Sequence, residues 1–159
     1  MAEITQINGG EKLGKSMRVG IIASRFNAVI TDALLKGCID TLRAGGVAEK
    51  DIMVVRVPGA FEIPFVARRL AAQGECEVLI ALGAVIRGET PHFDYIAGQC
   101  ARGVAEVSAD LDVPILFGVL TTETLPQAAA RAGGEAGNKG ADAARAAIEM
   151  VNVLRALPK

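Results

Sequence analysis

Hydrophobic residues along the chain follow two alternating patterns. Four short runs, at residues 17–23, 51–57, 78–86 and 113–120, are rich in Val, Ile and Leu with little polar interruption. Such runs are typical of strands that are buried on both faces of a parallel sheet. Between the runs lie longer segments whose apolar residues recur at helical spacing. The alternation predicts an α/β fold in which a four-stranded parallel sheet carries helices on both faces.

The helical segments are bounded by residues that commonly start and end helices. Pro64 suits a first helical turn and Gly74 suits a helix end, and we expect helices at residues 31–44, 64–73, 93–110, 125–132 and 140–157. The stripe on the last helix is expected to bury Ala144, Ile148, Val151 and Leu154. Residues 1–16 are expected to form an extended or mobile N-terminal segment, followed by one domain over residues 17–159.

Composition adds a prediction about assembly. Hydrophobic residues make up 51 % of the chain before its 18 glycines are counted, whereas both classes together make up roughly 45–50 % of an ordinary soluble domain. No apolar run approaches the roughly 20 residues that cross a bilayer, and the N-terminus lacks the apolar core of a signal peptide. We therefore expect the excess apolar surface to be buried between subunits and not in a membrane.

Charge and cysteine content indicate which kinds of partner and which cellular compartment to expect. The formal net charge of −1 provides no broad basic surface, so nucleic acid is not an expected partner. Cys38, Cys76 and Cys100 are far apart, and no Cys-x-x-Cys or His-rich tract offers metal ligands. We expect reduced thiols in a cytoplasmic protein, each most simply a small buried hydrophobe, with a reactive nucleophile as the alternative.

Residues that follow the predicted strands are expected to meet at one edge of the sheet, where open parallel sheets bind ligands. The loop after the third run carries Arg87, Glu89, Thr90 and His92, the only histidine of the chain. An imidazole changes charge near neutral pH, so His92 is the candidate general acid and base. The alternative is a structural histidine, but charged and hydroxyl neighbours at a strand end favour the catalytic role.

Two aromatic residues follow the first and second runs. Phe26 and Phe61 could stack on a planar heterocycle while Glu62 accepts hydrogen bonds from the N–H groups of its edge. The alternatives are that both phenylalanines fill loop cores and that Glu62 caps the following helix.

The glycine-rich stretch from Arg131 to Gly140 precedes the last predicted helix. Its backbone N–H groups, with Arg131 and Lys139, could bind a phosphate. It is not a P-loop, because Asn138 stands where the Walker pattern needs its second glycine and Gly140 where it needs Ser or Thr. A flexible connector with a solvated lysine is the alternative.

Five motifs, taken in order, resemble those of the 6,7-dimethyl-8-ribityllumazine synthase family. They are Arg25-Phe-Asn27, Val57-Pro-Gly-Ala-Phe-Glu-Ile-Pro64, Gly83-Ala-Val-Ile-Arg-Gly-Glu-Thr-Pro-His-Phe-Asp94, Phe117-Gly-Val-Leu-Thr-Thr-Glu-Thr124 and Ala136-Gly-Asn-Lys-Gly140. The resemblance runs from Val19 to the end of the chain and implies a three-layer, flavodoxin-like sandwich. It also implies the penultimate step of riboflavin synthesis, in which 5-amino-6-(D-ribitylamino)uracil condenses with 3,4-dihydroxy-2-butanone 4-phosphate, without cofactor or metal.

The resemblance implies a role for each site residue. The ribitylaminouracil would be bound by Phe26, which stacks on the pyrimidine, and by Ala60, Phe61, Glu62, Ala84, Val85 and Ile86. The butanone phosphate would lie at Glu89 and Thr90, and His92 would shuttle protons. A neighbouring subunit would contribute Phe117 to the pyrimidine site and Arg131 to the phosphate, with support from Lys139.

Assembly and the remaining alternatives also follow from the resemblance. Relatives form pentamers, and in many cases twelve pentamers close into an icosahedral shell, so we expect a homopentamer or a 60-subunit capsid, with riboflavin synthase as a further partner. The lack of an insertion before Ala136 favours the shell, whereas Gly134 and Glu135 depart from the Thr-Lys pair common in shell-forming relatives. The alternatives are a catalytically weak paralogue that kept a shell or a flavin pocket, and a generic phosphate-binding module.

Overall fold

The centre of the molecule is a sheet of four parallel strands. The computed structural model describes residues 3–13 and 15–159. The sheet has the order β2-β1-β3-β4, and its strands are β1 (Val19–Ser24), β2 (Ile52–Val57), β3 (Val78–Ile86) and β4 (Ile115–Thr122). All four predicted strands are present, and their ends differ from the predicted ends by no more than two residues.

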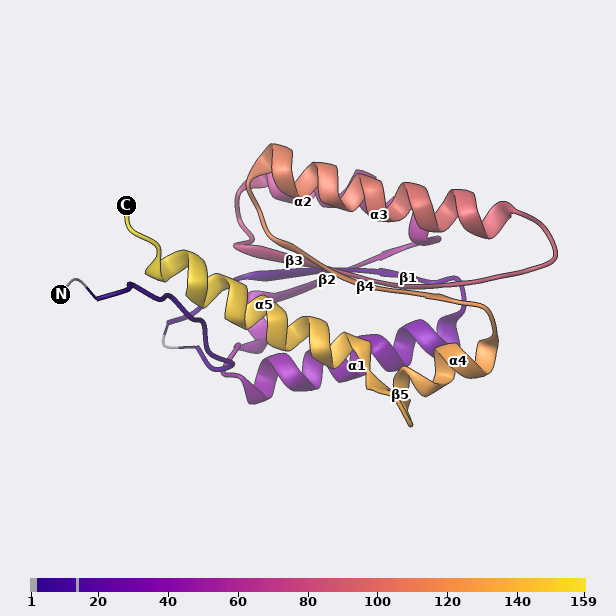
Figure 1. The fold of residues 1–159 in the computed structure, drawn as a ribbon, viewed down its shortest axis with the longest axis horizontal. Coiled ribbons are helices and arrows are strands. Elements are labelled where there is room, and N and C mark those ends of the chain that lie inside the picture. Colours follow the sequence, from indigo (N-terminus) through magenta and orange to yellow (C-terminus); the bar gives the residue numbers. More distant parts are fainter. Residues whose placement is uncertain (1–2, 14) are drawn as a thin grey trace.

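Helices cover both faces of this sheet and give the molecule three layers (Figure 1). One face carries α2 (Ile63–Gln73) and α3 (His92–Leu111), and the other carries α1 (Ala28–Ala44), α4 (Leu125–Ala130) and α5 (Lys139–Ala156). Short 3-10 helices at Glu49–Asp51 and Ala60–Glu62 precede β2 and α2. The predicted flavodoxin-like α/β sandwich is therefore confirmed.

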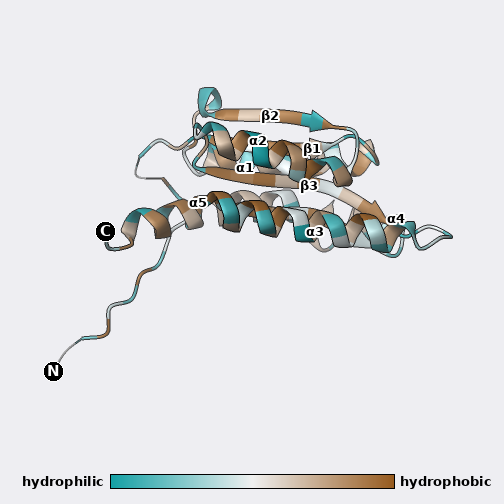
Figure 2. Ribbon diagram, turned by 90° about the horizontal axis from the view of Figure 1, so that it is seen from above, coloured by the Kyte–Doolittle hydropathy of each residue, from teal (hydrophilic) through white to brown (hydrophobic). Residues whose placement is uncertain are grey.

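The central and edge strands differ in burial. Every residue of β1 is buried, and so is β3 as far as Val85. The edge strand β2, at the rim of the sheet in Figure 2, exposes Met53 and Val54, and the other edge strand, β4, exposes Phe117. The expectation that all four strands are buried on both faces is wrong for these two, because an edge strand lacks a neighbour and is only partly covered by helices.

The apolar stripes of the helices fill a core on each side of the sheet. Residues of α1 and α5, including Cys38 and Ile148, pack on one face, and residues of α2 and α3, including Ala67 and Cys100, pack on the other. The predicted stripe of α5 is confirmed apart from Leu154, which is 43 % exposed. The last turn of α5 extends beyond the amino ends of the strands, so the sheet offers Leu154 no surface to cover (Figure 1).

Helix α1 begins earlier than predicted, at Ala28 and not at residue 31. Asn27 adopts the left-handed conformation with φ 61° and ψ 51°, which Asn tolerates better than most residues. Its carbonyl accepts hydrogen bonds from the N–H groups of Ile30 and Thr31, both at 3.0 Å. The apolar stripe could not indicate this first turn, because Val29 points into solvent.

The glycine-rich stretch contains a small antiparallel hairpin that the sequence pattern did not predict. Strand β5 (Ala132–Gly134) pairs with β6 (Gly137–Asn138). Two of its glycines have φ angles of 103° and 80°, values that residues with a Cβ avoid. The Ala136 N–H donates to the Ala130 carbonyl at 2.9 Å, which ties the hairpin to the end of α4. The stretch is therefore an ordered element and shortens α4 relative to the prediction.

The described part of the N-terminal segment has neither helix nor strand before β1. Asn152 of α5 donates its Nδ2 to the carbonyls of Gly10 at 2.9 Å and Lys12 at 3.1 Å. Nearer the N-terminus the segment runs away from the body of the molecule (Figure 2). Residues 1, 2 and 14, which belong to the segment expected to be extended or mobile, lie outside the described residues.

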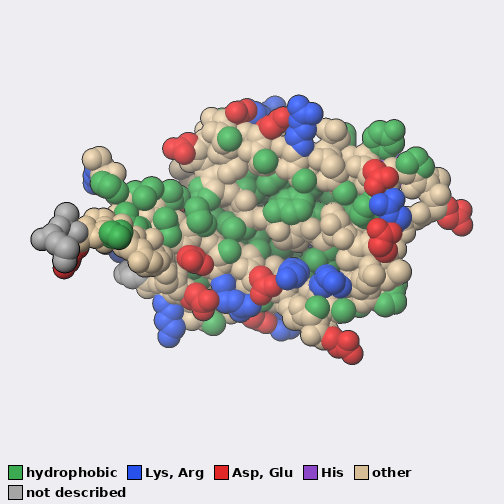
Figure 3. Space-filling view, in the orientation of Figure 1, with side chains coloured by type: hydrophobic (Ala, Val, Ile, Leu, Met, Phe, Trp, Pro, Cys, Tyr) green, Lys and Arg blue, Asp and Glu red, His purple; other side chains and the backbone are tan. Residues whose placement is uncertain are grey.

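Large apolar side chains remain on the surface. Figure 3 shows hydrophobic side chains gathered along the middle of one face, between the two helix layers. The exposed large hydrophobic residues are Ile4, Phe26, Val29, Met53, Val54, Phe61, Phe65, Tyr95, Phe117, Leu125, Met150, Leu154 and Leu157. Within the described ranges, no helix has both the length and the apolarity to cross a membrane. The single chain thus presents apolar surface of the kind that subunit contacts cover.

Candidate functional site

A cavity of about 620 Å³ opens at the carboxyl end of the strands, where open parallel sheets bind ligands. Its walls come from four places, namely the loop after β1, the segment between β2 and α2, the end of β3 with its following loop, and the first turns of α3. The predicted site residues that line it are Phe26, Ala60, Phe61, Glu62, Ala84, Val85, Ile86, Thr90 and His92. The structure therefore brings together residues that are up to 66 positions apart in the chain.

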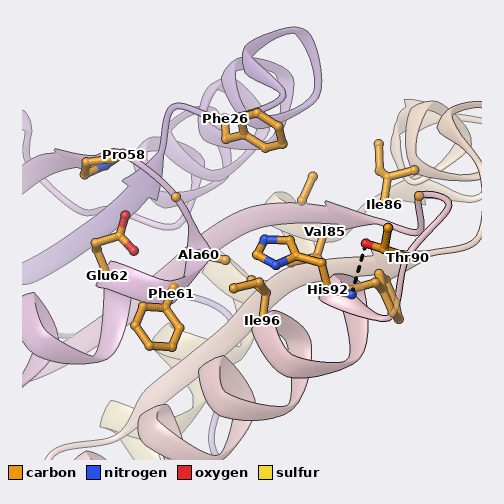
Figure 4. Close-up of a pocket in the computed structure, with 14 residues that line it drawn as sticks. Phe26, Pro58, Ala60, Phe61, Glu62, Val85, Ile86, Thr90, His92 and Ile96 are labelled. Atoms are coloured by element: carbon orange, nitrogen blue, oxygen red, sulfur yellow. Dashed lines mark hydrogen bonds between the residues drawn. The ribbon is translucent and has the colours of Figure 1, made fainter.

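Two exposed aromatic rings border the cavity. In the view of Figure 4, Phe26 and Phe61 lie on opposite sides of the His92 imidazole. Phe26 is 71 % exposed and Phe61 is 57 % exposed, so the alternative that they fill loop cores is wrong for this chain. The Phe26 N–H donates to the Pro58 carbonyl at 3.0 Å, which joins the loops after β1 and β2. Both rings therefore offer exposed aromatic surface at the border of the cavity.

Glu62 ends the 3-10 helix that precedes α2, and its side chain lines the cavity. It makes no capping hydrogen bond to α2, so the alternative capping role is not realised and the carboxylate is available to a ligand. The end of β3 forms the adjoining wall, and Asn27 Nδ2 donates to the Ala84 carbonyl at 2.9 Å. This bond fixes the loop that carries Phe26 against the strand that carries the wall.

His92 is the first residue of α3, and its imidazole faces the cavity (Figure 4). Its backbone N–H donates to Thr90 Oγ1 at 3.4 Å, and the side chain is exposed. Within the described residues the imidazole has no hydrogen-bond partner, so His92 is not a buried, satisfied structural histidine here. Both ring nitrogens can therefore meet a substrate, as a general acid and base requires.

Four predicted site residues do not line this cavity. Glu89 lies in the loop before α3, beside the lining residues Gly88 and Thr90. Phe117 is 43 % exposed on β4 and lines a second, shallow cavity of about 420 Å³ against α3. Arg131 donates its Nη1 to the Gln127 carbonyl at 2.9 Å, and Lys139 lies 3.5 Å from Asp142 Oδ2. In this single chain the predicted phosphate residues Arg131 and Lys139 are separate from the cavity.

Five lining residues were missed by the sequence reasoning, namely Pro58, Gly59, Gly88, Phe93 and Ile96. Phe93 and Ile96 are partly buried and pack against the core on this side of the sheet, so they serve the core and the cavity together. A signal was present, because His92 and Ile96 are four positions apart and share one face of a helix.

The cysteines do not contribute to the site. Cys38, Cys76 and Cys100 are free and buried, as predicted. Burial raises the pKa of Cys38 to about 12 and that of Cys100 to about 11, which suppresses the thiolate that a nucleophile needs. Throughout the described ranges, no three His, Cys, Asp or Glu residues are grouped closely enough to hold a metal ion.

A comparison with protein-family models agrees with the motifs and the cavity. The model described as 6,7-dimethyl-8-ribityllumazine synthase matches residues 16–155, which include the whole sheet, every residue that lines the cavity and most of α5. The generic phosphate-binding module is therefore not needed to explain the fold. With this match over most of its length, the chain belongs to the 6,7-dimethyl-8-ribityllumazine synthase family, a family of transferases in riboflavin biosynthesis.

Proposed function

We propose that the chain condenses 5-amino-6-(D-ribitylamino)uracil with 3,4-dihydroxy-2-butanone 4-phosphate to form 6,7-dimethyl-8-ribityllumazine, releasing phosphate and water. The observation that carries the proposal is one cavity onto which two exposed aromatic rings, a carboxylate and the only histidine converge. A flat pyrimidine needs apolar surface for its faces and an acceptor for its N–H groups. Membership of the family supports the same type of reaction.

Each lining residue has a part in this proposal. Phe26 stacks on the pyrimidine, while Glu62 and its neighbours Ala60 and Phe61 hold the ring and the ribityl chain. The cavity wall at the end of β3, from Ala84 to Ile86, is nearly all apolar side chain and suits the ring. The phosphate of the butanone lies toward Thr90 and Glu89, at the amino end of α3, where backbone N–H groups favour an anion.

His92 transfers protons during imine formation, phosphate elimination and ring closure. The reaction joins an amine to a ketone, so it needs two oriented substrates and no activated protein nucleophile. Orientation alone can contribute roughly 7–11 kcal/mol to such a reaction, whereas one general acid–base group contributes typically 10²–10⁴-fold. We therefore expect His92→Ala to slow turnover without abolishing it.

Assembly is part of the proposal. Phe117, Arg131 and Lys139 complete the site from a neighbouring subunit, in a homopentamer or a 60-subunit shell. In support, none of the three lines the cavity of its own chain, and Phe117 is exposed on an edge strand. Apolar side chains also gather on the face shown in Figure 3. Gly134 and Glu135 lie in the hairpin between Arg131 and Lys139, so they would lie at the same contact between subunits.

Location and a further partner belong to the same proposal. The three free thiols support a reducing compartment, and we infer a cytoplasmic location. The partner proposed for the assembled particle is riboflavin synthase, which would take up the lumazine product. Co-elution of the two proteins in size-exclusion chromatography at low salt tests this association.

The deciding experiment measures lumazine formation by absorbance from the two substrates, with light scattering on the same size-exclusion peak. Turnover above the spontaneous rate in a particle of pentamer size or larger supports the proposal. A well-assembled particle that gives no acceleration, and that carries bound flavin or lumazine in its absorbance spectrum, would instead identify the catalytically weak paralogue. His92→Ala in the same assay separates proton transfer from the contribution of orientation.

A further inference from the structure

Arg87, the first residue after β3, joins two segments beside the cavity. Its Nη2 lies 3.0 Å from Asp94 Oδ1 and its Nη1 lies 3.4 Å from Asp94 Oδ2, so the guanidinium forks onto the carboxylate. Its Nε lies 2.8 Å from Glu123 Oε2, in the loop after β4. The same guanidinium stacks on Phe93, 4.4 Å from the ring centroid. One side chain thus connects the first turn of α3 to the loop after β4.

The loop after β4 is itself held in place. The Arg87 N–H donates to the Thr122 carbonyl at 2.9 Å. The N–H groups of Glu123 and Thr124 both donate to Gln127 Oε1, at 2.8 Å and 3.3 Å, and Thr124 completes the capping box of α4. Glu123 therefore presents its carboxylate to Arg87 from a fixed backbone.

On its other side, Arg87 holds the two residues that follow His92. Phe93 lines the cavity, and the Arg87 guanidinium lies over the face of its ring. Asp94 is hydrogen-bonded to the turn through its N–H, which donates to the Pro91 carbonyl at 3.0 Å. The bond from the His92 N–H to Thr90 Oγ1 is longer, at 3.4 Å. The position of the imidazole therefore depends on the turn that Arg87 anchors.

This arrangement differs from an ordinary surface ion pair. The pair between Arg102 and Glu106, on the same helix, is an exposed contact within one helix face, of a kind that contributes little. Arg87 meets two carboxylates from separate segments and an aromatic face, a combination that suits a planar guanidinium and that a lysine ammonium cannot reproduce. The hydrogen bond to Asp94, with the nearby Glu123, raises the pKa of Arg87.

We propose that Arg87 is a positioning residue, which holds the first turn of α3 so that His92 and Phe93 keep their places in the cavity. Arg87 does not line the cavity, so its proposed role involves no contact with the reacting atoms. The inference rests on the proposed role of His92, and it adds a residue that acts on the reaction through the backbone of α3.

The kinetic test uses Arg87→Met and Arg87→Lys, with Arg102→Met, an exposed arginine on α3, as the control. We expect Arg87→Met to lower kcat about tenfold, because a small displacement of a reacting group is costly. The KM for the pyrimidine should change less than twofold, and Arg87→Lys should lie between Arg87→Met and the wild type. Asp94→Asn should lower kcat alone but add nothing in the Arg87→Met background. Equal kcat values for all these variants, in particles of wild-type size, would overturn the inference.

A second readout does not depend on turnover. His92 is the only histidine, so carbethoxylation by diethyl pyrocarbonate, followed at 240 nm, reports on one imidazole. We expect Arg87→Met to change its rate at least threefold, while Arg102→Met leaves it unchanged. An unchanged rate in Arg87→Met shows that Arg87 does not position His92. If the wild type forms no lumazine, the proposed function fails, and the carbethoxylation rates still decide whether Arg87 positions His92.

Discussion

At the scale of single residues, the cavity depends on side chains that the chain leaves in solvent. Phe26 and Phe61 carry large apolar rings, yet both are more exposed than buried. Removing such a ring leaves no buried void, so it should affect ligand binding and leave stability nearly unchanged. Residues of this kind allow the two effects to be measured separately.

Phe26→Ala provides this measurement. Loss of aromatic stacking is worth about 0.5–1.5 kcal/mol, so we expect the KM for the pyrimidine to rise roughly two- to thirteenfold. The midpoint of thermal unfolding should stay within experimental error. Phe65→Ala is the control, because Phe65 is also exposed but lies on α2 outside the cavity. A KM effect of equal size in both variants would contradict the assigned stacking.

The buried thiols give a prediction about pH. Burial raises the pKa of Cys38 to about 12 and of Cys100 to about 11, from an ordinary value of 9.0. The folded state holds these protons more tightly than the unfolded state, so the resulting stability is complete below pH 9.0 and is lost toward pH 11 and 12. We expect the unfolding midpoint to fall steadily through that range. Replacing both residues by Ala should flatten the fall, and an unaltered slope would exclude these thiols as its cause.

Some residues of the site could be predicted from the sequence and others could not. His92, Glu62 and Phe26 could be assigned because each carries unusual chemistry at the end of an apolar run. Phe93 could not, because an apolar residue on a helix has the same pattern whether it faces core or cavity, and for Ile96 only the four-residue spacing from His92 indicates the cavity. The anchoring of Arg87 could not be predicted either, since it depends on Glu123, which lies in a different loop.

At the scale of elements, Asn138 adds polar contacts to the apolar packing of α1 against α5. Asn138 Oδ1 accepts from the N–H groups of Gly140 at 2.8 Å and Ala141 at 3.0 Å, so it caps α5. Its Nδ2 donates to the Ala33 carbonyl of α1 at 3.1 Å. A Cβ at Gly140 would overlap the Leu34 carbonyl oxygen, which explains the glycine at this crossing. The hydrogen bonds of Asn138 hold the hairpin and Lys139, the first residue of α5, against α1.

Asn138→Ala should therefore lower the free energy of unfolding by about 1–2 kcal/mol, the usual cost of removing a helix cap. Asn138→Asp keeps the cap acceptor and loses the bond to Ala33, so its effect should be smaller. Asp40→Ala removes exposed ion pairs with Lys36 and Arg43 and should cost less than about 0.5 kcal/mol. Urea unfolding at one protein concentration measures all three. A loss for Asn138→Ala no larger than that for Asp40→Ala would show that the cap is not needed.

Element positions were more predictable from the sequence than element ends. The strands β1 and β3 could be predicted closely because nearly every residue in them is buried. The first turn of α1 and the hairpin could not, because the left-handed Asn27 and the pairing of β5 with β6 are set by contacts with β3 and α4. A pattern of apolar residues indicates which residues are buried, and the first turn of α1 and the hairpin bury few apolar side chains.

At the scale of the whole molecule, the proposed site is divided between the cavity and residues distant from it. If Arg131 serves the cavity of a neighbour, two inactive variants can complement each other. Phe61→Asp disables a cavity, and Arg131→Ala disables the phosphate contact that a subunit gives to the next. Random co-assembly of equal amounts should restore about a quarter of the sites in a closed ring.

The complementation is measured as lumazine formation after the two variants are dissociated, mixed and reassembled. Each variant treated alone in the same way is the control. Activity of the mixture equal to the mean of the two controls would show that each subunit builds its site from its own residues. Sequence composition could indicate an oligomer through its apolar excess, but the number of subunits depends on contact angles that no single chain contains.

The C-terminal end of α5 lies far from the cavity. Arg155, near the end of α5, contacts Glu77 and the Ser16 carbonyl, and Glu77 directly precedes β3. The C-terminus and the segment that leads into β1 therefore lie toward the amino ends of the strands, whereas the cavity opens at their carboxyl ends (Figure 1). A fluorescent label or a carried enzyme fused after Lys159 would be attached at the opposite end of the strands from the cavity. An attachment at this position leaves the opening of the cavity in the same chain unobstructed.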